Sequence, residues 1–164
     1  MAAARASSLV LSNEETQRLE TIIRNHMRVL FHTNRLLDDR KPPSRRAIYR
    51  FFRDTGVAGV DVCLLALADL RASYEQTLAQ ETWAAALDVV REFLENWYEK
   101  PAESIAPPSL VDGDTLMSEF SLPAGKQIGE LIGAIREAQA AGEIATREQA
   151  LDLARKIVDE MSKR

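Results

Sequence analysis

The stretch "VDVCLLALADL" (residues 60–70) is apolar around almost its whole circumference when it is drawn as a helix. A helix of that kind is usually buried at the centre of a domain. Its only acidic residues are Asp61 and Asp69. Because a buried carboxylate needs a partner, we expect Asp69 to be buried and paired with an arginine of the preceding helix, Arg50 or Arg53.

Amphipathic helices are predicted on both sides of this stretch. The segment "RRAIYRFFRDT" (residues 45–55) follows Ser44, a favoured N-cap residue, and precedes Gly56, which can take the left-handed conformation that closes a helix. The segment "ETWAAALDVVREFLENWYEK" (residues 81–100) has large apolar residues at spacings of four and three. They are Trp83, Leu87, Val90, Leu94 and Trp97. This stripe indicates a surface that packs on the core or on another helix.

Helical signals also dominate both ends of the chain. Ser12 and Glu15 form a capping box that opens a helix, which we expect to end near residues 33–34. Thr146 and Gln149 form a second capping box ahead of another amphipathic segment. No stretch shows the alternating pattern of a β-strand. The predicted fold class is therefore all-α.

A change of composition marks a boundary near residue 100. The stretch "PAESIAPPSLVDGD" (residues 101–114) holds three prolines and one glycine, which is typical of linkers and turns. We expect a helical body of about four helices over residues 1–100 and a small helical tail over residues 101–164. In the tail, Asp114 is the expected cap of one short helical turn, and Gly142 is expected to end the long helix that follows.

The charge of the chain is unevenly distributed. The formal net charge is −4, yet residues 1–54 carry a balance of +5 and residues 55–164 a balance of −9. Cations are densest between Arg35 and Arg53, where seven of them meet two acids. A basic block of this kind is typical of a contact with polyanions, and it is equally typical of a solvated helix face.

Three arginines of this block share one helix face. Arg46, Arg50 and Arg53 are separated by spacings of four and three, which places them on the same side. One interpretation is that they contact RNA phosphates. The other is that they form ion pairs with Asp61 and Asp69, which would give these acids the partners they need.

A second candidate site is the helix start within "SLPAGKQIGELIGAIREAQAAGEI" (residues 121–144). A helix N-terminus offers unpaired backbone N–H groups and a partial positive charge, so it can hold a phosphate. Gly125 allows a ligand to approach the backbone, and Lys126 adds a full charge. The alternative interpretation is an ordinary capped helix with no ligand.

The sequence carries no clear pattern for catalysis, a metal or a cofactor. His26 and His32 are six residues apart on one predicted helix, so they point to different faces. No phosphate-binding glycine-rich loop of the nucleotide-binding type is present. The single cysteine, Cys63, lies in an apolar run and is expected to be a small buried residue. We therefore predict no metal, no cofactor and no catalytic residue.

The setting predicted for the chain is the cytoplasm. One cysteine cannot form a disulfide within the chain, which suits a reducing compartment. The N-terminal "MAAARASSLVL" lacks the long apolar core of a secretory signal. No apolar run reaches the length needed to span a membrane, so no membrane partner is expected.

Three segments together resemble a known protein family. They are "LSNEETQRLETIIRNHMR" (residues 11–28), "RAIYRFFRDTGVAGVDVCLLALADLRA" (residues 46–72) and "LVDGDTLMSEFSLPAGKQIGELIGAIREAQAAGEIATREQALDLAR" (residues 110–155). In this order they resemble the C-terminal region of bacterial tRNA nucleotidyltransferases and poly(A) polymerases, particularly the members that carry a His-Asp phosphohydrolase domain. The likeness runs from about residue 11 to residue 155.

The resemblance implies a region without catalysis. In the family, an N-terminal head carries the catalytic carboxylates, the metal ions and the nucleotide-reading residues, and nothing here matches that head. The helical regions of the family support the head and hold the tRNA. The implied partners are therefore tRNA or another RNA, and a catalytic head in the same chain or in another. At "LPAGK" the family commonly has Pro-Gly-Pro, where this chain has Ala124 and Lys126 beside Gly125.

Three alternatives to RNA binding follow from the same segments. The chain could be a purely structural helical module, or a module that forms a homodimer through the face of Trp83 and Trp97. The third alternative, ranked last, is a fragment of a hydrolase. RNA binding should depend steeply on salt, whereas a dimer should show a mass that depends on concentration.

Overall fold

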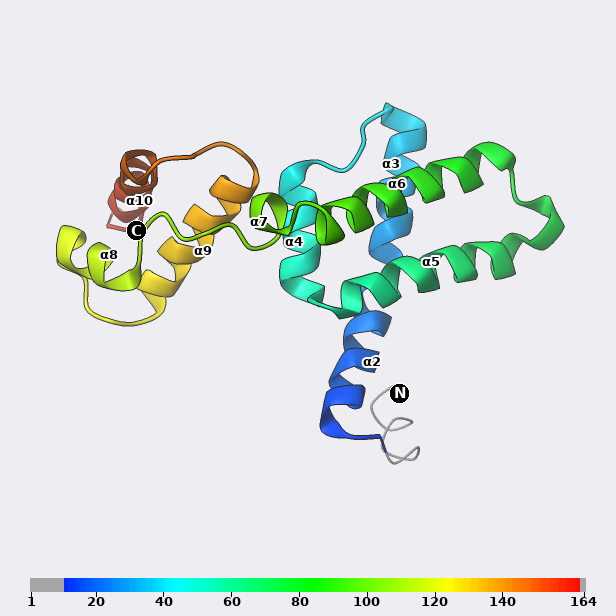
Figure 1. Ribbon diagram of the computed structural model, residues 1–164, viewed down its shortest axis with the longest axis horizontal. Helices are drawn as coiled ribbons and strands as arrows, with labels where there is room; N and C mark the ends of the chain where they lie inside the picture. The colour runs from blue at the N-terminus through cyan, green and yellow to red at the C-terminus, as the bar shows by residue number, and fades with distance from the viewer. Residues whose placement is uncertain (1–10, 163–164) are drawn as a thin grey trace. The chain divides into compact units, whose positions relative to one another are not determined.

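The structure is a computed structural model that describes residues 11–162 of the 164 in the chain (Figure 1). All regular structure in these residues is helical, which confirms the predicted all-α fold class. The segment inspected for a secretory signal lies, apart from Leu11, outside the described residues. The helices are α2 (Asn13–Asn25), α3 (Met27–Asp39), α4 (Arg45–Thr55), α5 (Ala58–Tyr74), the 3₁₀ turn η1 (Glu75–Thr77), α6 (Gln80–Tyr98), α7 (Pro101–Ser104), α8 (Gly113–Phe120), α9 (Lys126–Ala140) and α10 (Arg147–Met161).

The chain divides into two compact units. The first comprises the described residues up to Pro43 together with Phe51–Glu99, and the second comprises Ser44–Arg50 with the described residues from Lys100 onward. The division passes through α4, whose first turns belong to the second unit. The division into a body over residues 1–100 and a tail over residues 101–164, as parts that fold independently, remains a prediction.

The first unit is built on a hairpin of α5 and α6, which run antiparallel and are joined by η1 (Figure 1). Helix α3 packs against α6. An aromatic cluster forms the core. The Phe51 and Phe93 rings lie 4.4 Å apart, and the Phe52 ring stacks on Trp97 at 4.7 Å. Offset aromatic pairs of this kind add to the free energy that burial of their large surfaces contributes.

The N-terminal helical region begins as predicted but extends further. Ser12 Oγ accepts from the Glu15 N–H, and the Glu15 carboxylate accepts from the Ser12 N–H, so the predicted capping box is confirmed. The prediction of a single helix that ends at residues 33–34 is wrong, because the helical region is interrupted at His26 and its second helix, α3, continues to Asp39. Val29 and Thr33 are buried on α3, which packs on α6, and burial of this face favours continuation of the helix.

Helix α5 is buried on one side only, so the prediction of a helix buried all round is wrong in part. Val62, Cys63 and Ala66 are at most 2% exposed. Leu64 and Leu65, in contrast, are 56% and 40% exposed. The reason is that α5 contacts α2, α3 and α6, and these neighbours leave its opposite side open to solvent.

Helix α6 buries only part of the predicted stripe of large residues, in which Val90 is buried and Trp97 stacks on Phe52. Val89 and Phe93 are fully buried, and Val90 is 5% exposed. Leu87, a member of the predicted stripe, is 42% exposed. Small residues such as Ala86 form part of the buried side. Close packing against α3 and α5 favours small side chains, so size alone did not identify the core face.

The second unit contains a compact core formed by α8, α9 and α10. Its fully buried members include Leu116, Leu131 and Ala154, one from each helix. The Thr146–Gln149 capping box opens α10 as predicted. Gly142 follows α9 with φ 78°, in the left-handed region that favours glycine, which confirms its predicted role.

The stretch between the predicted body and tail holds more helix than we expected. Pro101 occupies the first turn of α7, and Ser104 at its end is only 2% exposed. The short turn predicted to be capped by Asp114 is wrong in both respects. Helix α8 runs on to Phe120, and its cap is Asp112, which accepts from the Thr115 N–H at 2.8 Å.

Candidate functional site

Two arginines of the predicted RNA-contact face form ion pairs with the end of α9. Arg46 Nη2 lies 2.6 Å from Glu143 Oε2, and Arg46 Nε lies 3.4 Å from Glu137 Oε1. Arg50 Nη2 donates to Glu137 Oε1 at 2.5 Å. All four residues belong to the second unit. The first turns of α4 are therefore held to the C-terminal part of α9 by charge-assisted contacts.

Arg45, which the sequence analysis did not single out, makes a third contact in the same place. Its Nε donates to the Ala140 carbonyl at 3.1 Å, and its Nη2 donates to the Glu103 carbonyl at 3.3 Å. The last carbonyls of a helix lack intrahelical partners and carry a partial negative charge, so a cation is favourable there. Because Ala140 is 95 positions away, no local pattern around Arg45 could have indicated this contact.

The acids predicted to pair with these arginines, Asp61 and Asp69, have other surroundings in the structure. Asp69 is exposed, so the prediction that it is buried and paired with Arg50 or Arg53 is wrong. Asp61 pairs instead with Arg18, at 2.6 Å. Arg53 pairs with its neighbour Asp54 at 2.9 Å. Asp69 lies on the open side of α5, where water can solvate its carboxylate.

The second candidate site, at Gly125 and Lys126, is an open helix start. Gly125 is the N-cap of α9, and no side chain of the described residues caps this helix. A Cβ added at Gly125 would meet none of their atoms within 4 Å. The Lys126 side chain is 91% exposed and lies 3.4 Å from Glu130 in an i,i+4 pair. The first backbone N–H groups of α9 thus lie beside an exposed cation, which favours an anion at this end.

The two candidate sites of the second unit lie at opposite parts of one helix. Lys126 begins α9, whereas Glu137, the partner of Arg46 and Arg50, is eleven positions further on. At the rise of an α-helix, this spacing corresponds to roughly 17 Å along the axis. Arg53 belongs to the first unit, so the three arginines are not one site in the same unit.

No metal-binding cluster is present in residues 11–162. No group of three or more His, Cys, Asp or Glu side chains there lies close enough to hold a metal ion. His32 is buried between Phe31 and Phe93, and its burial, together with nearby Arg28 and Arg35, lowers its pKa. Burial raises the pKa of Cys63 to about 12, so the thiol is protonated and a poor nucleophile.

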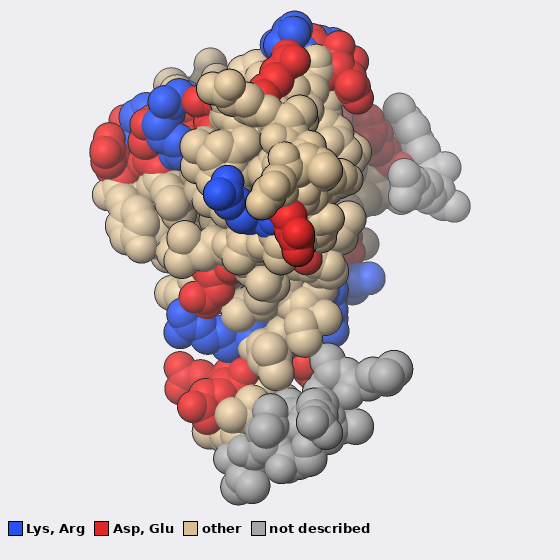
Figure 2. Space-filling view, turned by 90° about the vertical axis from the view of Figure 1, so that its right-hand side faces the viewer, with Lys and Arg blue, Asp and Glu red and all other residues tan. Residues whose placement is uncertain are grey.

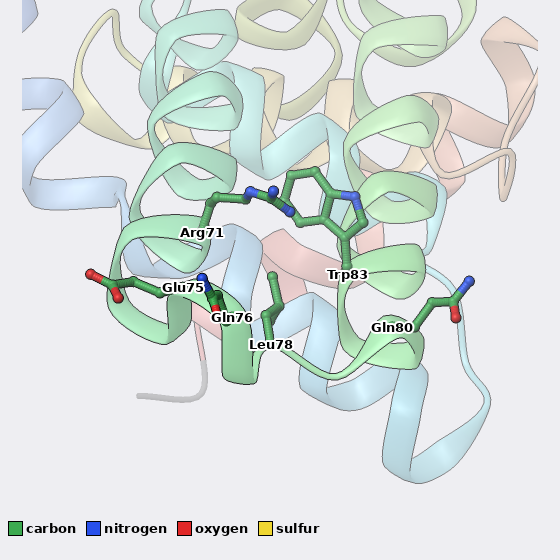
Figure 3. A pocket seen from close by; sticks show the side chains of 6 residues that line it. All are labelled: Arg71, Glu75, Gln76, Leu78, Gln80 and Trp83. Carbon is green, nitrogen blue, oxygen red and sulfur yellow. The ribbon is translucent and has the colours of Figure 1, made fainter.

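A hollow lies at the turn between α5 and α6, where Arg71, Trp83 and Leu78 point toward one another (Figure 3). The guanidinium of Arg71 lies over the Trp83 ring, 5.8 Å from its centroid. Glu75 also lines the hollow. Figure 2 views the molecule from this side, and uncharged residues make up most of the centre of that face. The Glu75 side chain points away from Arg71 and Trp83 (Figure 3).

Comparison with known proteins confirms the resemblance predicted from the sequence. Over 149 residues, 90% of its length, the chain is 29% identical to a CC-adding tRNA nucleotidyltransferase from Thermus thermophilus. The match spans only 30% of that relative. No family model and no solved structure matches the chain. The similarity is consistent with a C-terminal region of a nucleotidyltransferase that lacks the catalytic head.

None of the helices in the part of the chain that the structure describes is both long enough and apolar enough to cross a lipid bilayer.

Proposed function

We propose that this chain is a non-catalytic, tRNA-binding region of a nucleotidyltransferase-like protein that acts on RNA 3′ ends. The observation that carries the proposal is the 29% identity over 90% of the chain to a CC-adding tRNA nucleotidyltransferase. The chain spans only 30% of that relative, and in this proposal catalysis is carried by a head outside these 164 residues, in the same polypeptide or in another. The proposed setting is the cytoplasm. The reaction proposed for the parent protein is the addition of a CCA end or of a poly(A) tail to RNA.

The start of α9 is the better supported of the two proposed RNA contacts. Gly125 and Lys126 are exposed, and within residues 11–162 no side chain occupies the cap position. Lys126 pairs with Glu130, which is itself about half exposed. An RNA phosphate could accept from the first N–H groups of α9 and lie near the lysine ammonium. Such contacts fix the position of the RNA and carry no base information, so tRNAs of different sequence should bind alike.

The face formed by Arg46, Arg50 and Arg53 is proposed to make a smaller contribution to RNA affinity. The side chains of Arg46, Arg50 and Arg53 are 40%, 51% and 49% exposed, so each can still present part of its guanidinium to a phosphate. Their ion pairs with Glu137, Glu143 and Asp54 reduce the local positive field. Lys126 should therefore contribute more to the affinity for RNA than any one of these arginines.

Filter binding of tRNA across a salt series tests the proposal. Lys126→Ala should weaken binding by a few-fold to about tenfold, and it should lower the slope of log K against log salt by about 0.7–0.9. Lys156→Ala is the matched control, because Lys156 is an exposed lysine on α10 of the same unit. It should leave the binding curve and the slope unchanged.

Two results would contradict the proposal. The first is no binding of tRNA by the wild-type chain even at low salt. The second is identical binding curves for wild type and Lys126→Ala, which would leave a structural role for the helix start.

The proposal that the chain is non-catalytic is tested separately. The chain is incubated with ATP, CTP, magnesium and a tRNA that lacks its 3′ end. Addition of nucleotides above a buffer control would show that the chain is itself an enzyme.

A further inference from the structure

The hollow at the turn between α5 and α6 has the composition of a small-ligand site. Its volume is about 710 Å³, within the range of roughly 300–1,000 Å³ that is typical of such sites. Its walls include the indole ring of Trp83, the aliphatic side chain of Leu78, the guanidinium of Arg71 and the amide of Gln76. All four residues belong to the first unit. A ligand that matches this set has one flat apolar part and one anionic part.

The guanidinium of Arg71 is positioned by the indole ring and has no acidic partner within residues 11–162. It lies over the Trp83 ring, 5.8 Å from the centroid, and the residue is exposed. No ion pair of Arg71 occurs among those residues. The first acid of α6, Glu81, pairs with Arg40 at 3.2 Å and does not line the hollow. The N–H donors of Arg71 are therefore open to an anionic group.

The backbone at Glu75 explains why Arg71 lacks an ion pair. Glu75 follows Arg71 by four positions, which in a continuous helix is the spacing of a side-chain pair. Helix α5 ends at Tyr74, however, and Glu75 has φ 44° and ψ −117°, a conformation that non-glycine residues rarely adopt. Its side chain points away from Arg71 and Trp83 (Figure 3). Backbone outliers of this kind are frequent at ligand sites.

We propose that this hollow binds a single unstacked ribonucleotide, with its base against Trp83 and Leu78 and its phosphate on Arg71. Aromatic rings and guanidinium planes are the surfaces on which proteins stack unpaired bases. The amide of Gln76 has donors and an acceptor, which suit the edge of a base. Arginine donors match the oxygens of a phosphate. The inference rests on the proposed binding of RNA, and it adds a base contact to the phosphate contacts proposed at α9.

One nucleotide, and not an RNA double helix, suits the surroundings of the hollow. A double helix is held through many phosphates, so its site needs several cations. Within the described residues, Arg71 is the only cation that lines the hollow. Uncharged residues make up most of the centre of the face on this side (Figure 2). The nucleotide therefore belongs to a single-stranded segment, where the base is free to leave its neighbours.

Fluorescence anisotropy of a labelled single-stranded trinucleotide, titrated with the full chain at low salt, tests the proposal. Trp83→Leu should weaken binding by about tenfold, because one base loses its aromatic platform. Trp83→Phe keeps a ring and should retain most of the affinity. Tyr98→Leu is the matched control, since Tyr98 is an exposed aromatic residue of α6 that does not line the hollow. It should bind as wild type does.

An abasic trinucleotide separates the base contact from the phosphate contact. It has the same charge and no bases, so wild type and Trp83→Leu should bind it equally. Arg71→Gln should weaken the binding of both oligonucleotides by a few-fold and lower the slope of log K against log salt by about 0.7, the value for one phosphate of a single strand. Arg91→Gln is the matched control, because Arg91 is an exposed arginine of α6 that does not line the hollow.

Tryptophan fluorescence measures occupancy of the hollow directly. The chain has two tryptophans, Trp83 and Trp97, so Trp97→Phe leaves Trp83 as the only reporter. The trinucleotide should quench this fluorescence, and the abasic form should not. Lys126→Ala should leave the quenching unchanged, so a failure of the contact at α9 and a failure of the hollow are distinguishable. Circular dichroism verifies that each variant keeps its helicity.

Two further arms identify the source of the nucleotide. Trp83→Leu should weaken the binding of tRNA by a few-fold, because an RNA strand supplies the nucleotide. Quenching of Trp83 by adenosine monophosphate, with tRNA binding unchanged in Trp83→Leu, would support the same site with a free nucleotide as its ligand.

Three outcomes would overturn the proposal. Trp83 fluorescence could stay constant at millimolar trinucleotide and adenosine monophosphate, which would leave the hollow to a different class of ligand. The abasic form could quench as strongly as the trinucleotide, which would show that no base enters the hollow. Tyr98→Leu and Arg91→Gln could weaken binding as strongly as Trp83→Leu and Arg71→Gln, which would locate the contact elsewhere.

Discussion

Arg50 Nη2 lies 2.5 Å from Glu137 Oε1, and Arg46 Nε lies 3.4 Å from the same oxygen. The Glu137 side chain is 15% exposed, whereas those of the two arginines are 40% and 51% exposed. The acid is therefore the desolvated member of the group. A carboxylate in that position depends on its cations, while each arginine keeps contact with water.

Glu137→Gln should lower the free energy of unfolding by about 1–2 kcal/mol, because two charge-assisted contacts are lost. The expected cost is modest because both arginines are partly exposed and therefore screened by solvent. Urea unfolding followed by circular dichroism measures the change. Glu143→Gln is the control, and it should cost less than about 1 kcal/mol, since Glu143 is 55% exposed. An equal cost for both variants would show that burial of Glu137 has no special role.

Glycine-to-alanine substitutions in two helices should change the free energy of unfolding in opposite directions. A Cβ at Gly59 of α5 would lie 2.6 Å from Thr55 Oγ1 and 2.7 Å from the Phe52 ring, so Gly59→Ala should destabilise by about 1–3 kcal/mol. A Cβ at Gly133 of α9 would meet no atom of the described residues within 4 Å. Gly133→Ala should therefore stabilise by about 0.5–1 kcal/mol, the usual gain from replacing a helical glycine. Thermal or urea unfolding of both variants measures the two changes, and a stabilising Gly59→Ala would contradict the close approach of α4 and α5.

Stability should fall as the pH drops below about 6.5, through the titration of His32. Its pKa in the folded chain is lowered from 6.5 by burial and by Arg28 and Arg35. Below 6.5 the unfolded chain therefore binds a proton before the folded chain does, and the loss continues until the folded pKa is reached. A single group can contribute at most about 1.4 kcal/mol per pH unit.

His32→Phe is the variant that isolates this effect, because it keeps an aromatic ring against Phe93 and removes the titrating nitrogen. The unfolding free energies of wild type and variant should diverge as the pH falls through about 6.5 and below, with wild type losing more. Parallel pH profiles would show that His32 does not contribute to the pH dependence.

Cys63 should be unreactive toward thiol reagents while the chain is folded. It is fully buried, and its pKa of about 12 leaves roughly one thiolate in ten thousand at about pH 8. Labelling with a chromogenic disulfide should therefore proceed at the rate at which the first unit opens, and it should become rapid in denaturant. Fast labelling without denaturant would show that α5 is exposed in solution.

Local signals in the sequence were sufficient for most of the helices and for several of their ends. The capping boxes at Ser12 and Thr146, and the left-handed glycines at Gly56 and Gly142, are present as predicted. These features depend on backbone N–H and C=O groups that are satisfied within a few residues, so the neighbouring sequence determines them. The resemblance to tRNA nucleotidyltransferases was also readable from residues alone, and the Thermus thermophilus relative supports it.

Only the tertiary structure decided which side of each helix is buried and which acid pairs with which arginine. Leu64 is as apolar as any residue of α5 yet lies in solvent, because α2, α3 and α6 cover the other side. The ion pair of Arg50 joins residues 87 positions apart, and the exposed Asp69, closer in sequence, is not its partner. Helical periodicity specifies a face but not what packs on it, since long-range packing is settled by the volumes and charges of all the helices together.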